Sequence, residues 1–513
     1  MVALFLIWGL IFLASRGAGN LLLKRSGLEL PEGERWFAAF WVGFLGLSSV
    51  GLAVAAVMPL RWELAGLLVP LAWLGRGGPR APWAFWWVLA AMTSVSVNPE
   101  RVYDTALYHR PLIEWMSQEG LIAGLGNLHY RFGFSSGWFV WSALADHGPL
   151  FGRMGSAAAG VALASFVVCW LQVAARLGRG EGDRAARFLA VAVPVVCWFV
   201  FSHSFVVSPS PNLGAALAVV VVIWLLLVPG GDALALAAAG AAVAVKMSAA
   251  VLLPVCLWRT RRWWALAGAL ALPLVLANYR TTGCPLFPSA VLCVEKADGV
   301  GAERARGVAR ETREWARHGG PYPEEARFWS AAWIPGWASS WRARMEMGLI
   351  AAGIVWVSWR RAWDAAAWAA LGGVAYVLVA APDFRFGCGY LAALVARGAA
   401  EWRFRLPAIP PRLLTVAAVV VLVAGGRLAA VYPNYTYPEA EMQWSADRWW
   451  RPARAWKPAK VGVREWNGIR VRVPLGEDDR CGAAGRPCAP AGVVAPGLHY
   501  CAARLGVRGG YCR

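Results

Sequence analysis

The sequence predicts an all-α polytopic membrane protein, with roughly a dozen helices in the bilayer. Of its 513 residues, 58% are hydrophobic and only 16% are charged, whereas soluble domains are about half apolar and about a quarter charged. Uncharged apolar runs recur between short charged loops, which is the pattern of membrane helices. Many of the 32 tryptophans lie at the ends of those runs, where an amphipathic ring favours the headgroup region.

The first apolar run covers residues 2–14. Lys24 and Arg25 follow this run rather than precede it, which favours a retained first helix over a cleaved signal peptide. Later uncharged runs cover residues 215–228, 264–276, 349–359 and 413–424. Several runs are shorter than the ~20 residues that cross ~30 Å of hydrocarbon. We therefore expect some helices to be broken or re-entrant.

Arginine-rich loops set the expected orientation. The clusters between apolar runs are Arg176/Arg179/Arg184/Arg187, Arg259/Arg261/Arg262, Arg360/Arg361 and Arg397/Arg403/Arg405/Arg412. Such short basic loops tend to be cytoplasmic, so the remaining loops should face outward. These are residues 98–131, 208–212, 279–344, 382–386 and everything after 431. Residues 132–145 are apolar enough to insert, but a full crossing would place the first cluster outside, so we expect a short re-entrant or surface-lying helix.

Two polar segments are expected on the outer side. Residues 279–344 should form a partly helical cap, because Ala302–His318 is charged and favours a helix while nearby tryptophans can lie on the membrane surface. Residues 432–513 should form a small separate domain after a transmembrane domain of residues 1–431. The tail holds Cys481, Cys488, Cys501 and Cys512.

An even cluster of cysteines in a Gly/Pro-rich tail indicates two disulfides and an oxidising compartment. The three pairings of Cys481, Cys488, Cys501 and Cys512 remain open. Cys284 and Cys293 are candidates for a third bridge. A zinc site is the weaker alternative, because the tail has no CxxC spacing, and no metal-binding residues are predicted.

The first outer loop is dense in ionisable groups. Its ionisable side chains include Asp104, His109, Glu114, His129 and Arg131. Placing such groups beside a membrane is costly unless they bind, catalyse or stay hydrated. The alternative is an amphipathic helix lying in the interface, since Leu107, Pro111 and Trp115 would share one face of a helix beginning near Asp104.

Three further charged residues stand out in later segments. Lys246 interrupts a stretch with no other charge, where an ammonium is costly unless it is paired or lines a wet cavity. We therefore expect a phosphate or carboxylate partner for Lys246. Asp383 and Arg385 lie between two apolar runs, where they either bind substrate or pair with each other.

These motifs resemble the GT-C superfamily of multi-pass membrane glycosyltransferases, which draw sugars from polyprenyl-phosphate donors. The resemblance lies in the acidic residue next to an aromatic, Tyr103-Asp104, and in the Asn-Tyr-Arg-Thr-Thr-Gly-Cys-Pro-Leu-Phe-Pro turn of residues 278–288. Residues 124–134, 208–212, 246–248, 383–387 and the cysteine-bearing tail more closely resemble a largely uncharacterised bacterial family of such proteins. The similarity spans most of residues 95–513.

The resemblance implies a GT-C-like bundle in the bacterial inner membrane, with outer loops 98–131 and 279–344. It also implies that Asp104 is the catalytic base or positions the acceptor. Two departures stand against this role: Thr105 follows Asp104 where a second acid is common, and Asn212 stands where an Asp is more usual. A second acid would then come from Glu100 or Glu114, or the protein is inactive.

The expected reaction is sugar transfer at the outer membrane face to a lipid, glycan or protein acceptor. Asp104 would take the acceptor proton, which as general-base catalysis contributes ~10²–10⁴-fold, while a cation stabilises the departing lipid phosphate. The candidate phosphate- and substrate-binding residues are Arg131, Lys246, Arg385, His109, Glu114 and Asp383. A divalent cation is the only candidate cofactor.

Two other classes of function remain open. A transporter or flippase of a lipid-linked or anionic molecule would also use broken helices and a buried lysine, and a non-catalytic scaffold with the glycosyltransferase fold is the third reading. The formal charge of +20 fits anionic lipids or phosphate substrates. Nucleic acid is not expected as a partner, because no groove-binding motif accompanies that charge. The sequence also contains neither the GxxxxGK[ST] motif nor the GxGxxG motif, which bind nucleotide phosphates in other proteins.

Overall fold

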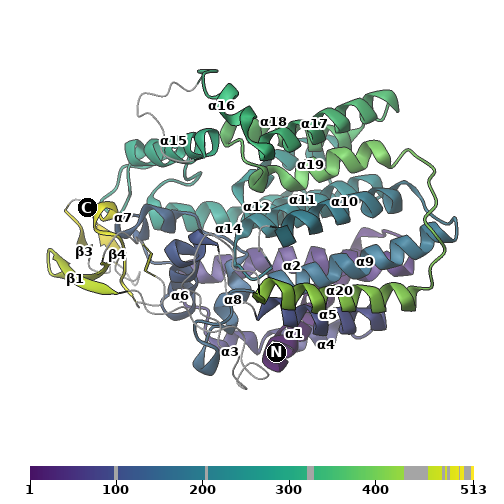
Figure 1. Cartoon of the computed structure of the whole chain (residues 1–513). Coiled ribbons are helices and arrows are strands. Elements are labelled where there is room, and N and C mark those ends of the chain that lie inside the picture. The colour runs from purple at the N-terminus through teal and green to yellow at the C-terminus, as the bar shows by residue number, and fades with distance from the viewer. Residues whose placement is uncertain are drawn as a thin grey trace.

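The protein is mostly helical, with a long helical bundle and four short strands near the C-terminus. The computed structural model describes residues 1–97, 102–202, 206–319, 329–431, 460–475, 480–481, 486–495, 497–501 and 510–512. The long helices lie roughly along one direction (Figure 1). The expected boundary at residue 432 begins the range 432–459, which lies outside the described residues.

Two N-terminal helices pair closely along one side of the bundle. They are α1 (Val2–Ser26) and α2 (Glu32–Val57). A Cβ on Gly43 would overlap the carbonyl oxygen of Ser15, so this crossing requires a residue without a side chain. Small residues that let backbones approach in this way are typical of helix packing in membranes.

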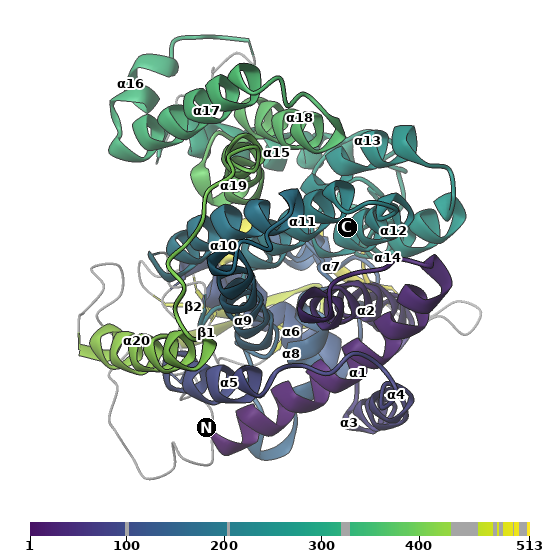
Figure 2. The ribbon, with the colours of Figure 1, turned by 90° about the vertical axis from the view of Figure 1, so that its right-hand side faces the viewer.

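The rest of the bundle packs in layers around α11. Its other long helices are α5 (Trp83–Ser96), α9 (Ala159–Gly178), α10 (Arg184–Ser202), α11 (Pro211–Leu227), α12 (Asp232–Val245), α14 (Trp264–Thr282), α17 (Trp341–Trp359), α18 (Ala365–Ala380), α19 (Phe384–Ala399) and α20 (Pro411–Val431). Helices α17 to α19 lie on one side and α1, α5 and α20 on the other (Figure 2). Nearly every residue of α11 is buried, which places the core at this helix.

Shorter helices connect and cap the bundle. They are α3 (Trp62–Ala65), α4 (Leu68–Leu74), α6 (Arg110–Gln118), α7 (Leu125–Leu128), α8 (Phe139–Ala145), α13 (Leu252–Arg259), α15 (Ala302–His318) and α16 (Ile334–Ser339). The charged helix expected in the outer cap is confirmed as α15. Within the segment 132–145, α8 has only 7 residues, which is too short to cross a bilayer.

Three described helices, α1, α2 and α9, are long and apolar enough to cross a membrane. Seven shorter apolar segments do not reach that length: Trp62–Leu74, Trp83–Ser96, Pro211–Leu227, Asp232–Val245, Met247–Arg259, Ala365–Ala380 and Pro411–Gly425. The described helices that are long enough to cross a membrane are thus fewer than the roughly one dozen that the apolar runs predicted. That some of these short helices are broken or re-entrant membrane elements stays a prediction.

The two ends of the bundle differ in what they carry. One end, called the arginine end here, holds the loops of residues 178–184 and 400–411, at the right of Figure 1. The other, called the loop end, holds α6, α7, α15 and the strands. The arginine-rich loops after α9 and α19 therefore share one end of the bundle, and the first predicted outer loop lies at the opposite one.

The described C-terminal segments form two antiparallel strand pairs. Strand β1 (Val461–Trp466) pairs with β2 (Ile469–Pro474), and β3 (His499–Cys501) pairs with β4 (Gly510–Cys512). Disulfides join Cys481 to Cys488, Cys501 to Cys512, and Cys284 to Cys293. The structure therefore agrees with the expected two bridges of the tail and the third bridge, and selects the sequential pairing.

These C-terminal segments pack on the first outer loop. The backbone N–H of Tyr511 donates to the carbonyl of Ala123 at 3.0 Å, and the amide of Asn127 donates to the carbonyl of Tyr511 at 3.0 Å. Val471 and Leu498 belong to the same buried apolar cluster as the loop. The described part of the tail thus shares its hydrophobic core with α6 and α7.

Candidate functional site

The described part of the predicted first outer loop, residues 102–131, begins with a buried turn of helix at the loop end. Asp104 precedes a π-helix, Thr105–His109, which runs directly into α6. Leu107 and Trp115 are only 4% and 5% exposed, because they pack against the protein. The alternative of a helix lying in the membrane interface does not fit this placement, because protein covers its apolar face. Isolated π-turns occur frequently at functional sites.

Ser208, the first residue of the Ser-Pro-Ser-Pro-Asn segment of residues 208–212, forms a hydrogen bond with this loop. The hydroxyl of Thr105 lies 2.8 Å from the hydroxyl of Ser208, and the N–H of Ser210 donates to the same Ser208 oxygen at 3.1 Å. Helix α11 then begins at Pro211, a residue well suited to a first helical position. Asn212 therefore lies in the first turn of α11, close to the loop that carries Asp104.

Lys246 reaches this segment from a break between helices. Helix α12 ends at Val245, and Lys246 itself is extended before a short 3₁₀ turn, Met247–Val251. Its ammonium donates to the side-chain oxygen of Asn212 and lies 4.3 Å from the ring centroid of Phe386. Among the described residues no carboxylate pairs with Lys246, and the neutral amide of Asn212 is its hydrogen-bond partner; the phosphate partner that the sequence also allowed stays a prediction.

Asp383 and Arg385 pair with each other at the start of α19. The Asp383 carboxylate accepts the N–H of Arg385 at 2.9 Å as a helix cap, and lies 3.3 Å from the Arg385 Nε. The guanidinium also lies over the rings of Trp315 and Phe386, at 4.5 Å and 4.7 Å. The pairing considered from the sequence is thus observed, and Asp383 has a structural role as N-cap.

Arg131 joins the first outer loop to α15. Its guanidinium donates to the carboxylate of Glu311 at 2.9 Å, and the hydroxyl of Tyr130 donates to the same oxygen at 3.0 Å. Arg131 also lies 5.9 Å from the ring centroid of Tyr108. The sequence offered no sign of Glu311 as a partner, because α15 carries charges of both signs along its length.

Four charged groups act on the buried ring of His109. Burial lowers the pKa of His109 to about 4; Asp104 opposes this change, and Arg131, Lys246 and Arg385 reinforce it. The imidazole is therefore neutral at pH 7, and its Nδ1 is buried without a hydrogen-bond partner among the described residues. The structure brings four of the predicted site residues into electrostatic reach of one side chain.

Asp383 also contributes to the electrostatic surroundings of Lys246. Arg385, Asp383 and Asp104 all act on the ammonium. The side chains of Asp104, Lys246, Asp383 and Arg385 are all half-buried. The site therefore combines carboxylates and cations in a partly dehydrated setting, where electrostatic interactions are stronger than in water.

Glu114 lies in a different environment. Its carboxylate is 3.3 Å from the Nε of Arg486, whose guanidinium also donates to Gln118 and stacks on Trp115 at 4.6 Å. The substrate-binding role expected for Glu114 is not supported by this placement, because the carboxylate anchors the C-terminal segment. Glu100, the other candidate for a second acid, lies outside the described residues.

A buried acid that the sequence analysis missed lies near Asp383. Glu346 of α17 is 2% exposed, and the charge of Asp383 acts on it. It lies in a helix of mixed composition, so nothing in the local pattern distinguished it. Asn212 and Phe386 were also missed as contacts of Lys246, although both belong to segments that the sequence analysis singled out.

One group of possible metal ligands occurs among the described residues. Ligand atoms of His499, Cys501 and Cys512 lie within 4.8 Å of one another. The two cysteines are joined in a disulfide, so they offer no thiolates, which are the sulfur ligands that metals bind. This group therefore belongs to the covalent closure of the tail.

Comparisons with known proteins place the chain in a family. No curated protein and no solved structure matches it. Residues 78–392, more than half of the chain, match the family model described as Domain of unknown function (DUF8201). The matched part includes Asp104, Arg131, Lys246 and Arg385 and ends before the cysteine-bearing tail. The chain therefore belongs to the DUF8201 family.

Proposed function

We propose that this protein is a multi-pass glycosyltransferase of the bacterial inner membrane, which transfers a sugar from a polyprenyl-phosphate donor at the outer face. The supporting observation is that Lys246 and Arg385 both lie over the ring of Phe386, at 4.3 Å and 4.7 Å, and that the charges of Asp104 and Arg131 act with theirs on the buried His109. A carboxylate and several cations are the groups that this transfer requires at its two reacting ends. The GT-C resemblance of the first loop adds to the proposal by analogy.

The proposed reaction moves one proton and exchanges one bond. Asp104 accepts the proton of the acceptor hydroxyl as its oxygen attacks the anomeric carbon of the sugar. The bond from that carbon to the phosphate oxygen breaks, and the phosphate leaves with the electron pair as polyprenyl phosphate. Lys246 and Arg385 stabilise the negative charge that develops on the leaving oxygen.

The proposed membrane orientation uses the asymmetry of the bundle. The arginine end faces the cytoplasm, as short basic loops tend to do. At the loop end, Arg306 and Arg310 of α15 are exposed, and Trp329 and Trp341 are 85% and 59% exposed. Exposed arginines and exposed tryptophans both suit contact with anionic lipid headgroups, so we place α15 and α16 on the outer membrane surface.

A lipid transporter is the second candidate. The break at Lys246 between α12 and the 3₁₀ turn supports it, because discontinuous helices form the substrate sites of many transporters. A transporter would move its lipid without breaking the sugar–phosphate bond. The products of an incubation with the labelled donor therefore separate the two functions.

The decisive experiment measures sugar transfer by the purified protein in proteoliposomes. The donor is a radiolabelled polyprenyl-phosphate sugar, and the acceptors come from a membrane extract of the source cells. Asp104→Asn keeps the shape of the side chain and removes its basicity, so we expect transfer to fall by ~10²–10⁴-fold. Asp232→Asn is the matched control, because Asp232 pairs with Arg259 away from the site.

Transfer by Asp104→Asn at the parental rate would contradict the role of Asp104 as base. The role of base would then pass to Glu100 or Glu114. Movement of intact donor across the bilayer without transfer would favour the transporter. If the parental protein neither transfers sugar nor moves the donor, a non-catalytic scaffold would be the remaining function.

A further inference from the structure

We propose that Asn212 holds Lys246 in place without neutralising it, and that these two side chains together form the binding site for the phosphate of the lipid-linked substrate. This inference rests on the proposed function and identifies, among its three candidate cations, the one that binds phosphate. It also gives a role to Asn212, a residue that the proposed mechanism does not otherwise use.

The three cations differ in what balances their charge. Arg131 has the carboxylate of Glu311 at 2.9 Å, and Arg385 has the carboxylate of Asp383 at 3.3 Å. In the described part of the chain, Lys246 forms no ion pair. Since a carboxylate partner must be displaced or shared before a phosphate can bind, Lys246 is the cation most available to an anion.

Asn212 is well fixed for this role. It lies in the first turn of α11, directly after a turn in which Ser208 bonds both Ser210 and Thr105. Lys246 is fixed from the opposite side by the end of α12. The ring of Phe386 lies 4.3 Å from the ammonium, where a cation–π contact favours the charged form without supplying a counter-ion.

The contact between the two side chains also orients the amide. An ammonium can only donate hydrogen bonds, so the Asn212 oxygen faces Lys246 and the Asn212 N–H groups point away from it. Those N–H groups, together with the remaining N–H groups of the ammonium, are donors for phosphate oxygens. An aspartate at position 212 would replace these donors with acceptors and add a negative charge that repels phosphate.

Both side chains are half-buried, so the donors are reachable but only partly hydrated. Hydrogen bonds from a charged donor are stronger in such a setting than in water. Asp104 acts on Lys246 through its charge and forms no hydrogen bond with it among the described residues. The hydrogen-bond donors of Lys246 other than the one directed at Asn212 are therefore not taken up by the proposed base.

The test compares binding of polyprenyl phosphate with binding of the corresponding uncharged polyprenol. The parental protein and its variants are placed in nanodiscs of zwitterionic lipid, and affinities are measured by native mass spectrometry. We expect the parent to prefer the phosphate by at least ~tenfold, about 1.4 kcal/mol. Asn212→Asp and Lys246→Met should each weaken phosphate binding by ~tenfold or more and leave polyprenol binding unchanged.

A matched control carries the same chemical change elsewhere. Asn467→Asp lies in the exposed turn between β1 and β2 and should bind both lipids as the parent does. Unchanged polyprenol binding in each variant also reports that the protein is folded. Competition by inorganic phosphate would show that the headgroup suffices for recognition, and its failure would show that the lipid chain is also required; either result supports the site.

Parental affinity of Asn212→Asp for polyprenyl phosphate would overturn the inference. Equal affinity of the parental protein for polyprenyl phosphate and polyprenol would also overturn it. So would an equal loss of affinity for both lipids in a variant whose unfolding temperature is the same as that of the parental protein. None of these measurements requires sugar transfer. Phosphate binding that depends on Asn212, in a protein that transfers no sugar, would leave the inference standing and remove the proposed enzyme.

Discussion

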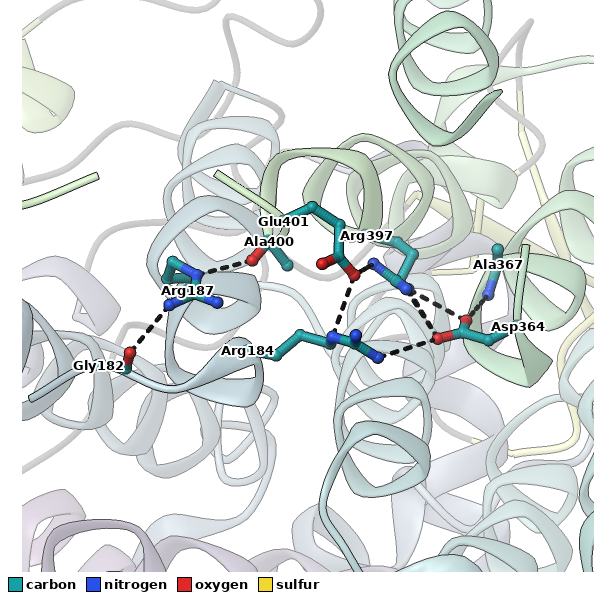
Figure 3. Close-up of polar contacts among 8 residues, drawn as sticks. All are labelled: Gly182, Arg184, Arg187, Asp364, Ala367, Arg397, Ala400 and Glu401. Carbon is teal, nitrogen blue, oxygen red and sulfur yellow. Dashed lines mark hydrogen bonds and ion pairs between the residues drawn. The ribbon is translucent and has the colours of Figure 1, made fainter. Parts of the chain in front are cut away.

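The two ends of the bundle use charged side chains in opposite ways. At the arginine end, Arg397 donates to Asp364 at 2.8 to 3.0 Å and to Glu401 at 2.7 Å. Arg184 adds contacts to the same two carboxylates, and Arg187 donates to two backbone carbonyls (Figure 3). This network joins the ends of α10, α18 and α19, and each arginine in it has protein partners.

At the loop end, the charges are only partly matched. Arg385 pairs with Asp383, but Lys246 is held by the neutral Asn212, and Asp104 forms no ion pair in the described part of the chain. The carboxylates of Asp364 and Glu401 balance the charges of Arg184 and Arg397, which indicates a structural network. Lys246 has a neutral side chain as its hydrogen-bond partner among the described residues, which leaves its charge available to an external anion. The comparison teaches that the partner of a charge, more than its burial, separates these roles.

The largest expected effect on stability is at the arginine end. Arg397→Met removes the buried cation that Asp364 and Glu401 share and leaves them only the more exposed Arg184. We expect the free energy of unfolding to fall by about 3 kcal/mol. This value is at the lower end of the range for breaking a buried ion pair, because the Asp364 side chain is 35% exposed. Denaturant unfolding in detergent measures it, and Lys246→Met should lose far less.

Parental stability of Arg397→Met would show that the network is not structural. A loss of stability in Lys246→Met equal to that in Arg397→Met would remove the difference between the two ends.

An intermediate effect is expected where the tail meets the loop end. Arg486 joins β-strand segments of the tail to Glu114 and Gln118 of α6. Hydrogen bonds to charged groups contribute roughly 1.5–3 kcal/mol, so Arg486→Gln should weaken the docking of the tail by about that range. Hydrogen exchange in residues 110–128 should rise, while exchange at the arginine end stays unchanged. Equal exchange in both proteins would show that other contacts hold the tail.

The smallest effect is expected for a surface pair of the arginine end. Arg179 and Glu181 pair at 2.9 Å, but both side chains are more than half exposed. Solvent and salt screen such pairs, so Arg179→Ala should leave the unfolding temperature unchanged. A clear decrease would mean that the Arg176–Asp183 region extends the buried network to the surface.

Much of the fold could be predicted from local sequence. The alternation of apolar runs and arginine loops predicted a helical bundle, and the charges of Ala302–His318 predicted α15. The cysteines of the tail predicted its disulfides, because few residues there are apolar. Each of these features is a property of one short segment.

The contacts between segments could not be predicted in the same way. Glu114 and Arg486 are 372 residues apart, and neither segment carries a sign of the other. Asn212 stood out only as a departure from an expected Asp, and its meaning came from Lys246. The sequence therefore predicted several residues of the site, whereas only the structure showed which carboxylates pair with arginines.

The central claim is that the loop end binds a lipid phosphate, and photo-crosslinking tests it most directly. A polyprenyl phosphate with a photoreactive group near its phosphate is irradiated with the protein in nanodiscs, and the adducts are located by mass spectrometry. We predict adducts in residues 102–134, 206–213 and 383–387 that excess unlabelled polyprenyl phosphate removes. Adducts confined to residues 178–184 and 400–411 of the arginine end, or adducts that resist competition, would contradict the account.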